Sequence, residues 1–317
     1  MDAALAILGI TGPIYLAMAL GYASTRRGLF EKSDMRSYGK FVIELALPAL
    51  LFNALSQRSV GEILNIPYLA AYALGSLITL ALGMLWARRV RGHQPKFSAI
   101  MAMGMACPNS GFVGYPIMLL TFGPVAGVAL ALNMVVENLL IIPILLALAD
   151  SDADGSVHWL ERVRQTLLGL LRNPLIWGIV GGFAFSLSGL QMPPPLARTV
   201  SLFAQASGAL SLFVIGGSLV GLKARGMIGT VSQIAVGKLL VHPLCMLLVL
   251  LWLVPIGDPS LRAMALLTGA MPMMGIYTIL AQRHGHEAIS AAALLVTTVA
   301  SFFTLSTLLW ILQHHPL

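Results

Sequence analysis

The order of apolar and polar residues along the chain predicts ten membrane-spanning helices. A stretch of roughly 20 apolar residues crosses the hydrocarbon core of a bilayer, and ten such stretches follow one another with short polar connections between them. They cover residues 3–23, 38–55, 68–87, 97–122, 124–148, 173–190, 196–222, 231–255, 261–282 and 287–312. This pattern is typical of an all-α membrane protein.

The longest polar connection, over residues 150–165, divides the chain into two halves. We expect a first unit over 1–149 with spans one to five, a linker on the cytoplasmic side over 150–165, and a second unit over 166–317 with spans six to ten. The segment PIYLAMALGYASTRRGL of the first half resembles PLIWGIVGGFAFSLSGL of the second half. Because each half has an odd number of spans, the second enters the membrane from the opposite side. The pattern therefore predicts two inverted five-helix repeats.

The fourth span contains residues that a continuous helix usually excludes. It reads CPNSGFVGYP over residues 107–116, and the ninth span reads GAMPMMGIY around Pro272. Proline removes a helical N–H and frees a carbonyl one turn back, and such irregular backbone survives in a membrane only inside the protein or along a cavity. We therefore expect helices 4 and 9 to be broken at matching positions of the two halves. The alternative is a plain proline kink.

A half-helix that begins inside the membrane offers free N–H groups and a partial positive charge to an anion. We therefore predict that the two breaks hold the substrate, with a further polar group from the second span. The candidate substrate-binding residues are Pro108, Asn109, Ser110 and Gly111 of the first break, Pro272, Met273 and Gly275 of the second, and Asn53.

Ionisable residues within the spans form a second set of candidates. Glu137 lies near the centre of the fifth span, and such a group is costly in a bilayer, so it is a functional candidate by default. We predict a coupling or supporting role for Glu137, Asn133, Asn138, Lys238 and His242. The alternatives are a structural, protonated or amide-paired Glu137 and a Lys238 that snorkels toward the nearby helix end. Glu44 lies closer to an interface, where snorkelling or pairing with Lys40 explains it.

Composition agrees with a polytopic membrane protein. The chain is 58% hydrophobic and 10% charged with a mean hydropathy of +0.87, whereas soluble domains have about 25% charged residues. The N-terminus lacks a basic region and a cleavage motif, so it reads as a retained first helix. Cys107 and Cys245 lie in apolar segments without metal-ligand spacing, and we expect no metal site and no cofactor.

The basic residues predict the orientation of the spans. Fifteen lysines and arginines fall in connections on one side and three on the other, and cytoplasmic loops carry the excess of Lys and Arg. This topology signal explains the net charge of +7 better than a surface for nucleic acid. Both termini are therefore expected in the periplasm. The fifteen are Arg26, Arg27, Lys32, Arg36, Lys40, Arg88, Arg89, Arg91, Lys96, Arg162, Arg164, Arg172, Lys223, Arg225 and Arg283; the three are Arg58, Arg198 and Arg262.

The sequence resembles the auxin efflux carrier family, which includes plant PIN auxin exporters and bacterial malonate and malate transporters. The resemblance covers nearly the whole chain and is most specific in FVIELALPALLFNAL, CPNSGFVGYPIML, GALSLFVIGGSLVG, GKLLVHPL and GAMPMMGIYTILAQRHG. It implies an inverted-repeat fold with broken, crossing helices 4 and 9, like that of NhaA and the bile-acid symporters. It also implies a homodimer in the bacterial inner (plasma) membrane and an elevator-like movement of a transport domain against a scaffold. It also implies that Asn109 contacts the substrate. The chain departs from the plant members at Met273 and Met274, where polar residues are common, and lacks their long hydrophilic central loop.

Together these observations favour a secondary or facilitative transporter of a small organic anion, malonate or another carboxylate, with coupling to protons or sodium left open. An intramembrane enzyme is disfavoured because the chain has no HExxH, no GxSxG and no aspartate within its spans. A channel is disfavoured because nothing resembles a repeated filter or a ring of charges. A membrane-embedded sensor of a small anion remains the alternative, although the chain has no soluble output domain.

The predicted orientation is testable in intact spheroplasts. A cysteine introduced at Ser156, within the linker, should be shielded from a membrane-impermeant thiol reagent because the linker faces the cytoplasm. Labelling of that cysteine without permeabilisation would reverse the orientation.

Overall fold

The computed structural model describes residues 2–58, 60–149, 168–169, 171–222, 227–275, 277–278, 281 and 285–315. The predicted linker over 150–165 lies outside these residues. The described chain is helical, and its one β-type contact is an isolated antiparallel bridge between Pro108 and Met273. The α-helices are α1 (Asp2–Arg26), α2 (Lys32–Phe41), α3 (Leu47–Ser56), α4 (Val60–Ile63), α5 (Ile66–Leu85), α6 (Pro95–Ala106), α7 (Tyr115–Phe122), α8 (Ala126–Val136), α9 (Ile142–Ala149), α11 (Pro174–Ser188), α12 (Pro194–Ser218), α13 (Ile228–Val236), α14 (His242–Trp252), α15 (Pro259–Ala270) and α17 (Glu287–His314).

Seven helical stretches of the described chain are long and apolar enough to cross a membrane. They cover Ile7–Arg26, Lys32–Ser56, Ile66–Val90, Ser110–Leu145, Pro194–Ser218, Ile228–Trp252 and Glu287–His314, and α11 is a shorter apolar helix. The stretch over Ser110–Leu145 is interrupted at Gly123, whose φ of 72° lies in a region that residues with a side chain rarely adopt. The prediction of an all-α membrane protein is confirmed.

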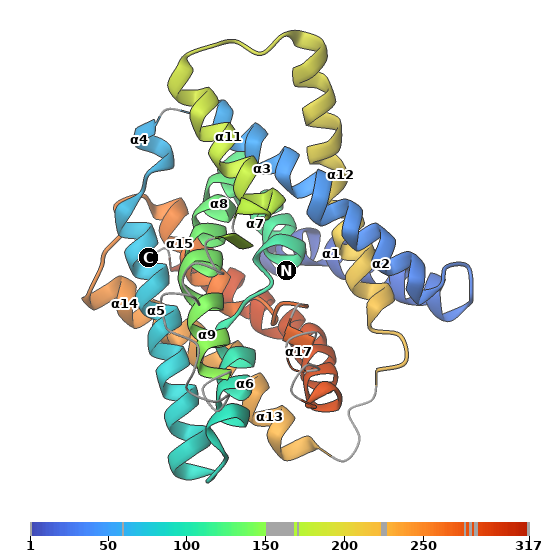
Figure 1. The fold of residues 1–317 in the computed structure, drawn as a ribbon, viewed down its shortest axis with the longest axis vertical. Helices are drawn as coiled ribbons and strands as arrows, with labels where there is room; N and C mark the ends of the chain where they lie inside the picture. The colour runs from blue at the N-terminus through green and yellow to red at the C-terminus, as the bar shows by residue number, and fades with distance from the viewer. Residues whose placement is uncertain are drawn as a thin grey trace.

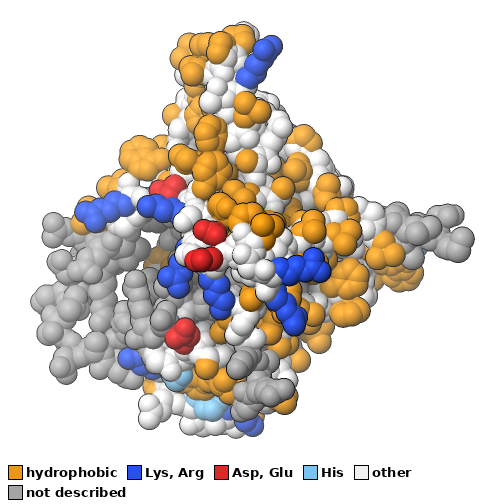
Figure 2. Space-filling model, turned by 90° about the vertical axis from the view of Figure 1, so that its right-hand side faces the viewer, with side chains coloured by type: hydrophobic (Ala, Val, Ile, Leu, Met, Phe, Trp, Pro, Cys, Tyr) orange, Lys and Arg blue, Asp and Glu red, His pale blue; other side chains and the backbone are white. Residues whose placement is uncertain are grey.

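The outer surface of the molecule is largely apolar. Many large hydrophobic side chains are exposed, including Leu16, Leu202, Trp252 and Phe303. Figure 2 looks at the end of the molecule where α1 and α2 are joined, and hydrophobic side chains cover much of the upper and right-hand parts of that face, whereas most Lys and Arg side chains lie nearer its centre with acidic side chains among them. Such a surface is stable in lipid, where apolar side chains replace the polar exterior of a soluble protein.

The helices pack in two groups. One consists of α1, α2, α3, α11 and α12, and the other contains α5, α6, α8, α9, α13, α14, α15 and α17. In Figure 1, α3, α11 and α12 occupy the upper part, whereas α5, α6, α9 and α13 occupy the lower part. The groups meet where α3 contacts α8 and where α1 contacts α17 and α7.

Glycines allow very close contacts within the first group. A Cβ atom on Gly216 of α12 would lie 1.8 Å from the carbonyl oxygen of Met18, and one on Gly21 of α1 would lie 2.1 Å from that of Phe213. Gly178 and Gly182 of α11 pack in the same way against the backbone of α3. Small residues four apart are a common means of helix association in membranes, because van der Waals packing drives it there.

Four helices contain a π-helical turn directly before a proline. These turns are η1 (Val42–Ala46), η3 (Ser110–Gly114), η5 (Glu137–Ile141) and η6 (Gly237–Val241), and each ends with a hydrogen bond that spans five residues instead of four. The donor is the residue before Pro48, Pro116, Pro143 or Pro243 in each case. Proline supplies no N–H and crowds the carbonyl four residues earlier, so the preceding turn widens. Such turns are frequent at functional sites.

The close contact between α1 and α12 gives a stability prediction. Gly216→Leu should force the two helices apart and destabilise the protein by about 2 kcal/mol, which lowers the Tm in detergent by roughly 4–8 °C. Gly9→Leu on α1 is the matched control, because a Cβ at Gly9 meets no atom within 4 Å. Equal melting temperatures for Gly216→Leu and the wild type would contradict this packing.

Candidate functional site

The two predicted breaks lie against each other and pair through their backbones. Helix α6 ends at Ala106 and α15 ends at Ala270. The Asn109 N–H then donates to the Pro272 carbonyl at 2.8 Å, and the Met274 N–H donates to the Cys107 carbonyl at 3.1 Å. Polar backbone groups that the two breaks release are thus paired with each other, as a non-polar environment requires. These four hydrogen-bonding residues, with Pro108 and Met273 between them, form what we call the crossover.

Asn109 starts the helix that leaves the crossover. Its side-chain oxygen accepts a hydrogen bond from the Phe112 N–H at 3.1 Å, which is an N-cap. The amide group has two further hydrogens that it can donate. The N–H groups of Ser110 and Gly111 come before the first intrahelical hydrogen bond, so they belong to the N-terminus that attracts anions. Asn109 is only 5% exposed.

The crossover lies at the boundary between the two groups of helices. Pro116 leaves the Phe112 carbonyl without its usual donor, and Ser211 of α12 supplies one from its hydroxyl at 3.0 Å. A Cβ on Gly111 would lie 3.3 Å from Leu47 of α3. The helix N-terminus is therefore covered by α3 and α12, which belong to the other group.

Glu137 connects to the crossover through Ser110. The Ser110 hydroxyl donates to Oε1 of Glu137, and the Tyr72 hydroxyl donates to the same oxygen at 2.7 Å. Glu137 is 2% exposed, and its Oε2 is buried without a hydrogen-bond partner among the described residues. A buried carboxylate needs compensating hydrogen-bond donors. Here both donors, the hydroxyls of Ser110 and Tyr72, bind the same carboxylate oxygen.

A second hydrogen-bonded chain runs beside the first, one helical turn away. The Tyr68 hydroxyl donates to Asn133 at 2.9 Å, and the Asn133 amide donates to Thr268 of α15 at 3.1 Å. Tyr68 and Tyr72 are one turn apart on α5, and Asn133 and Glu137 are one turn apart on the adjacent helix. Tyr68, Tyr72 and Thr268 are not among the residues predicted from the sequence. The spacing of Tyr68, Tyr72 and Ser76 on one face of an apolar helix was the signal for the α5 residues.

Lys238 follows Gly237, which packs against Met105 of α6, and it is completely buried. Its ammonium group is 3.0 Å from Nδ1 of His242 and donates to the Gly269 carbonyl at 2.6 Å. Ser76 of α5 is 3.3 Å from Nε2 of His242. The alternative in which Lys238 snorkels to an interface is wrong, because its charged end binds the C-terminal turn of α15, where the helix dipole favours a cation.

The remaining predicted residues separate into two kinds. Pro272 and Met273 belong to the crossover, and Gly275 follows it. Asn53 instead accepts a hydrogen bond from Gln57 on the outer part of α3, and Asn138 binds the Met134 carbonyl and Asn173. Glu44 is exposed. Within the described ranges, no three side chains among His, Cys, Asp and Glu are placed to share a metal ion.

The arrangement combines a helix N-terminus, an asparagine amide, a carboxylate and a lysine within one buried region. Its polar groups hold each other through hydrogen bonds. This chemistry suits the reversible binding of a small charged molecule.

Comparison with known proteins agrees with that chemistry. The family model described as "Membrane transport protein" matches residues 10–311. A protein of Rhizobium meliloti named "Putative malonate transporter" is 25% identical over 97% of this chain and 96% of its own length. The "Uncharacterized transporter YfdV" of Escherichia coli strain K12 is 26% identical over 94% of this chain and 95% of its own.

Plant relatives match a shorter part. "Auxin efflux carrier component 7" of Arabidopsis thaliana is 29% identical over 36% of this chain, which corresponds to 19% of the plant protein. Membership of the family does not depend on this local similarity, because the family model matches nearly the whole chain. The chain belongs to the membrane transport protein family that includes the auxin efflux carriers.

Proposed function

We propose that the chain is a secondary transporter of a small organic anion, with a dicarboxylate such as malonate as the first candidate. The observation that carries this proposal is the crossover, where a helix N-terminus with an asparagine cap lies buried between two groups of helices. An anion is stabilised there by hydrogen bonds and the helix dipole. The relative from Rhizobium meliloti, whose printed name refers to malonate, suggests the class of anion to test first.

The proposed architecture is two inverted five-helix repeats with ten spans and both termini in the periplasm of a bacterial inner membrane. The breaks after α6 and α15 are then the matching breaks of the two repeats. In this scheme the group that contains the crossover moves as the transport domain, and α1, α2, α3, α11 and α12 form the scaffold of a homodimer. The packing of η3 against α12 and α3 is the contact that such a movement breaks.

A carrier must bind its substrate weakly enough to release it. The crossover fits this requirement, because it offers hydrogen bonds and a helix dipole to the anion instead of a full positive charge. Each hydrogen bond or dipole interaction there is worth about 0.5–3 kcal/mol. The Lys238 ammonium is already bound to Gly269 and His242, so it contributes charge to the region without having to bind the anion directly.

The role of Asn109 is testable by binding and uptake. Asn109→Ala should weaken carboxylate binding by about tenfold or more, roughly 1.4 kcal/mol, because both the donor and the cap are lost. Ser110→Ala should have a smaller effect. Binding is measured by thermal shift and calorimetry with malonate, and transport by uptake of labelled malonate into proteoliposomes.

Asn173→Ala is the matched control for this experiment, because Asn173 also caps a helix but lies on α11. It should lower stability without weakening binding. If Asn109→Ala binds and transports malonate like the wild type, the first break is only a proline kink. If the wild type itself shows no saturable uptake, a sensor is favoured over a transporter.

Glu137 provides a route for coupling to protons. Ser110 has a single hydroxyl hydrogen, which it donates to Glu137 when the carboxylate is ionised. When Glu137 is protonated, its own hydrogen can be donated to Ser110, and the Ser110 hydrogen then becomes available to a substrate anion. Lys238 also acts electrostatically on Glu137, and Tyr72 donates a hydrogen bond to the same carboxylate. Protonation would therefore favour anion binding.

Glu137→Gln tests this coupling, because the amide stays neutral at every pH. We expect the variant to fold and to bind malonate with a weaker dependence on pH than the wild type, which should bind more tightly as pH falls. Tyr72→Phe removes the other donor to the same oxygen and should keep the pH dependence. An unchanged pH profile in Glu137→Gln would assign Glu137 to structure alone.

A further inference from the structure

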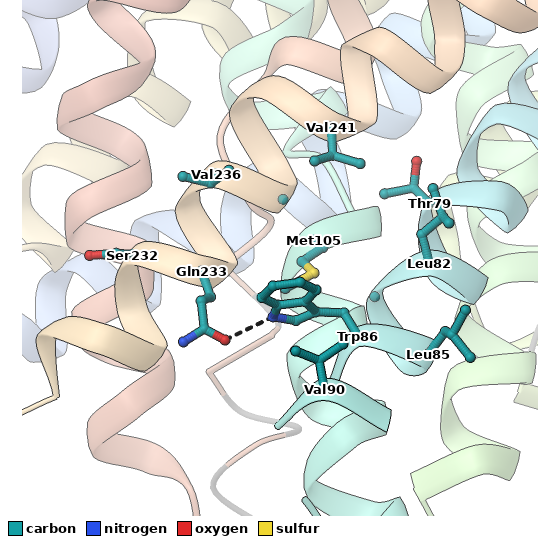
Figure 3. A pocket seen from close by; sticks show the side chains of 12 residues that line it. Thr79, Leu82, Leu85, Trp86, Val90, Met105, Ser232, Gln233, Val236 and Val241 are labelled. Carbon is teal, nitrogen blue, oxygen red and sulfur yellow. Dashed lines mark hydrogen bonds between the residues drawn. The ribbon is translucent and has the colours of Figure 1, made fainter. Parts of the chain in front are cut away.

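A groove of about 480 Å³ opens on the side of the molecule, between α5 and α13. Its wall on one side is formed by Leu82, Leu85, Trp86 and Val90, and the other wall includes Val236 and Val241 (Figure 3). The indole N–H of Trp86 donates to Gln233 at 2.9 Å, which links the two walls across the groove. Nearly all of the remaining surface is apolar.

The groove opens toward the bilayer. The residues along its edges are exposed although they belong to membrane-spanning helices: Leu85 is 56% exposed, Val90 60% and Val236 50%. Apolar side chains at such positions contact lipid chains in a membrane. Trp86, at 45% exposed, has the amphipathic ring that is common at the boundary between lipid tails and headgroups.

Positive charge lies on the wide turn Trp86–Val90 that follows α5. Trp86 and Val90 of this turn line the groove. Arg88 and Arg89 lie between them in the sequence, Arg91 comes directly after Val90, and all three arginines are exposed. The charges are therefore within a few residues of the groove wall, at the end of α5 that is predicted to face the cytoplasm.

We propose that this groove is a binding site for one anionic phospholipid, with an acyl chain between α5 and α13 and the phosphate group at Arg88, Arg89 and Arg91. The apolar walls suit a hydrocarbon chain, and arginine binds phosphate with two parallel hydrogen bonds. Basic residues at the cytoplasmic end of a membrane helix are typical contacts for anionic lipids.

The groove connects such a lipid to the crossover. Its floor contains Met105 and Gly237, and a Cβ on Gly237 would lie 2.4 Å from Cγ of Met105. Met105 comes two residues before Cys107, whose carbonyl pairs with Met274, and Gly237 comes directly before Lys238. A chain in the groove thus packs against the residues that position both sides of the crossover.

Fluorescence quenching tests the site directly. The chain has five tryptophans, and a variant that keeps only Trp86, with the others replaced by phenylalanine, reports on this groove. The protein is placed in liposomes that contain either phosphatidylglycerol or phosphatidylcholine with bromine on the acyl chain, and bromine quenches tryptophan on contact. The mole fraction of brominated phosphatidylglycerol that quenches half of the Trp86 fluorescence should be about fivefold or more below that of brominated phosphatidylcholine. A variant that keeps only Trp252, which is 80% exposed on α14, should show equal quenching by both lipids.

Two further variants identify the contacts. Arg88→Gln with Arg89→Gln should remove the preference for phosphatidylglycerol, whereas Arg36→Gln with Lys40→Gln removes two exposed charges of α2 and should leave it unchanged. Val236→Phe fills the groove and should reduce quenching by both lipids. Equal quenching of Trp86 by both lipids would overturn the proposal. Protection of Trp86 from both lipids, as a second copy of the chain in the groove would cause, would overturn it too. Because no substrate is used, the outcome is separate from that of the transport experiments.

Discussion

The pairing of two broken helices through their backbones is the interaction on which this structure depends. In a bilayer an unpaired carbonyl or N–H costs several kcal/mol, so a break in one spanning helix needs a partner. The break after α6 finds that partner in the break after α15, and the two hydrogen bonds around Pro108 and Met273 satisfy both. A polar environment inside the protein is thereby available for a ligand, at a position fixed by backbone geometry.

The polar side chains near the crossover follow from the same constraint. Ser211 donates to the carbonyl that Pro116 leaves free, Lys238 binds the end of α15, and Asn109 caps the helix that begins beyond the break. The cap at Asn109 is local, whereas Ser211 and Lys238 each bind an element that is distant in sequence. Substitution of Ser211 or Lys238 therefore leaves a partner unsatisfied in a different helix, and the effects of such substitutions are not expected to be additive.

The sequence contained enough information for the all-α membrane class and the positions of the two breaks, and too little for the contacts between the helices. Pro108 and Pro272 are recognisable because proline in an apolar stretch has few structural roles, and a helix ends just before each of them. The burial of Lys238 was not decidable, since its distance from the helix end fits both snorkelling and a contact with α15. The bonds of Tyr68 and Tyr72 were missed because they depend on which face of α5 turns toward Asn133 and Glu137. The spacing of Tyr68, Tyr72 and Ser76 marks a polar face of α5, but the partners of that face are set by packing between distant helices.

The wide turns before the prolines have a consequence for how this chain can change over time. A π-helical turn contains one residue more than an α-helical turn, so it behaves as a one-residue insertion inside a continuous helix. Loss of a single residue within Glu137–Ile141 or Gly237–Val241 would restore ordinary helical spacing and rotate one end of the helix by about 100° relative to the other. The Glu137 or Lys238 side chain would then turn away from its partners, although the composition and hydropathy of the span would hardly change. Deletions are therefore expected to be far less tolerated at these two places than substitutions by residues of similar size, and relatives that lack one of the turns should also lack the charge that it carries.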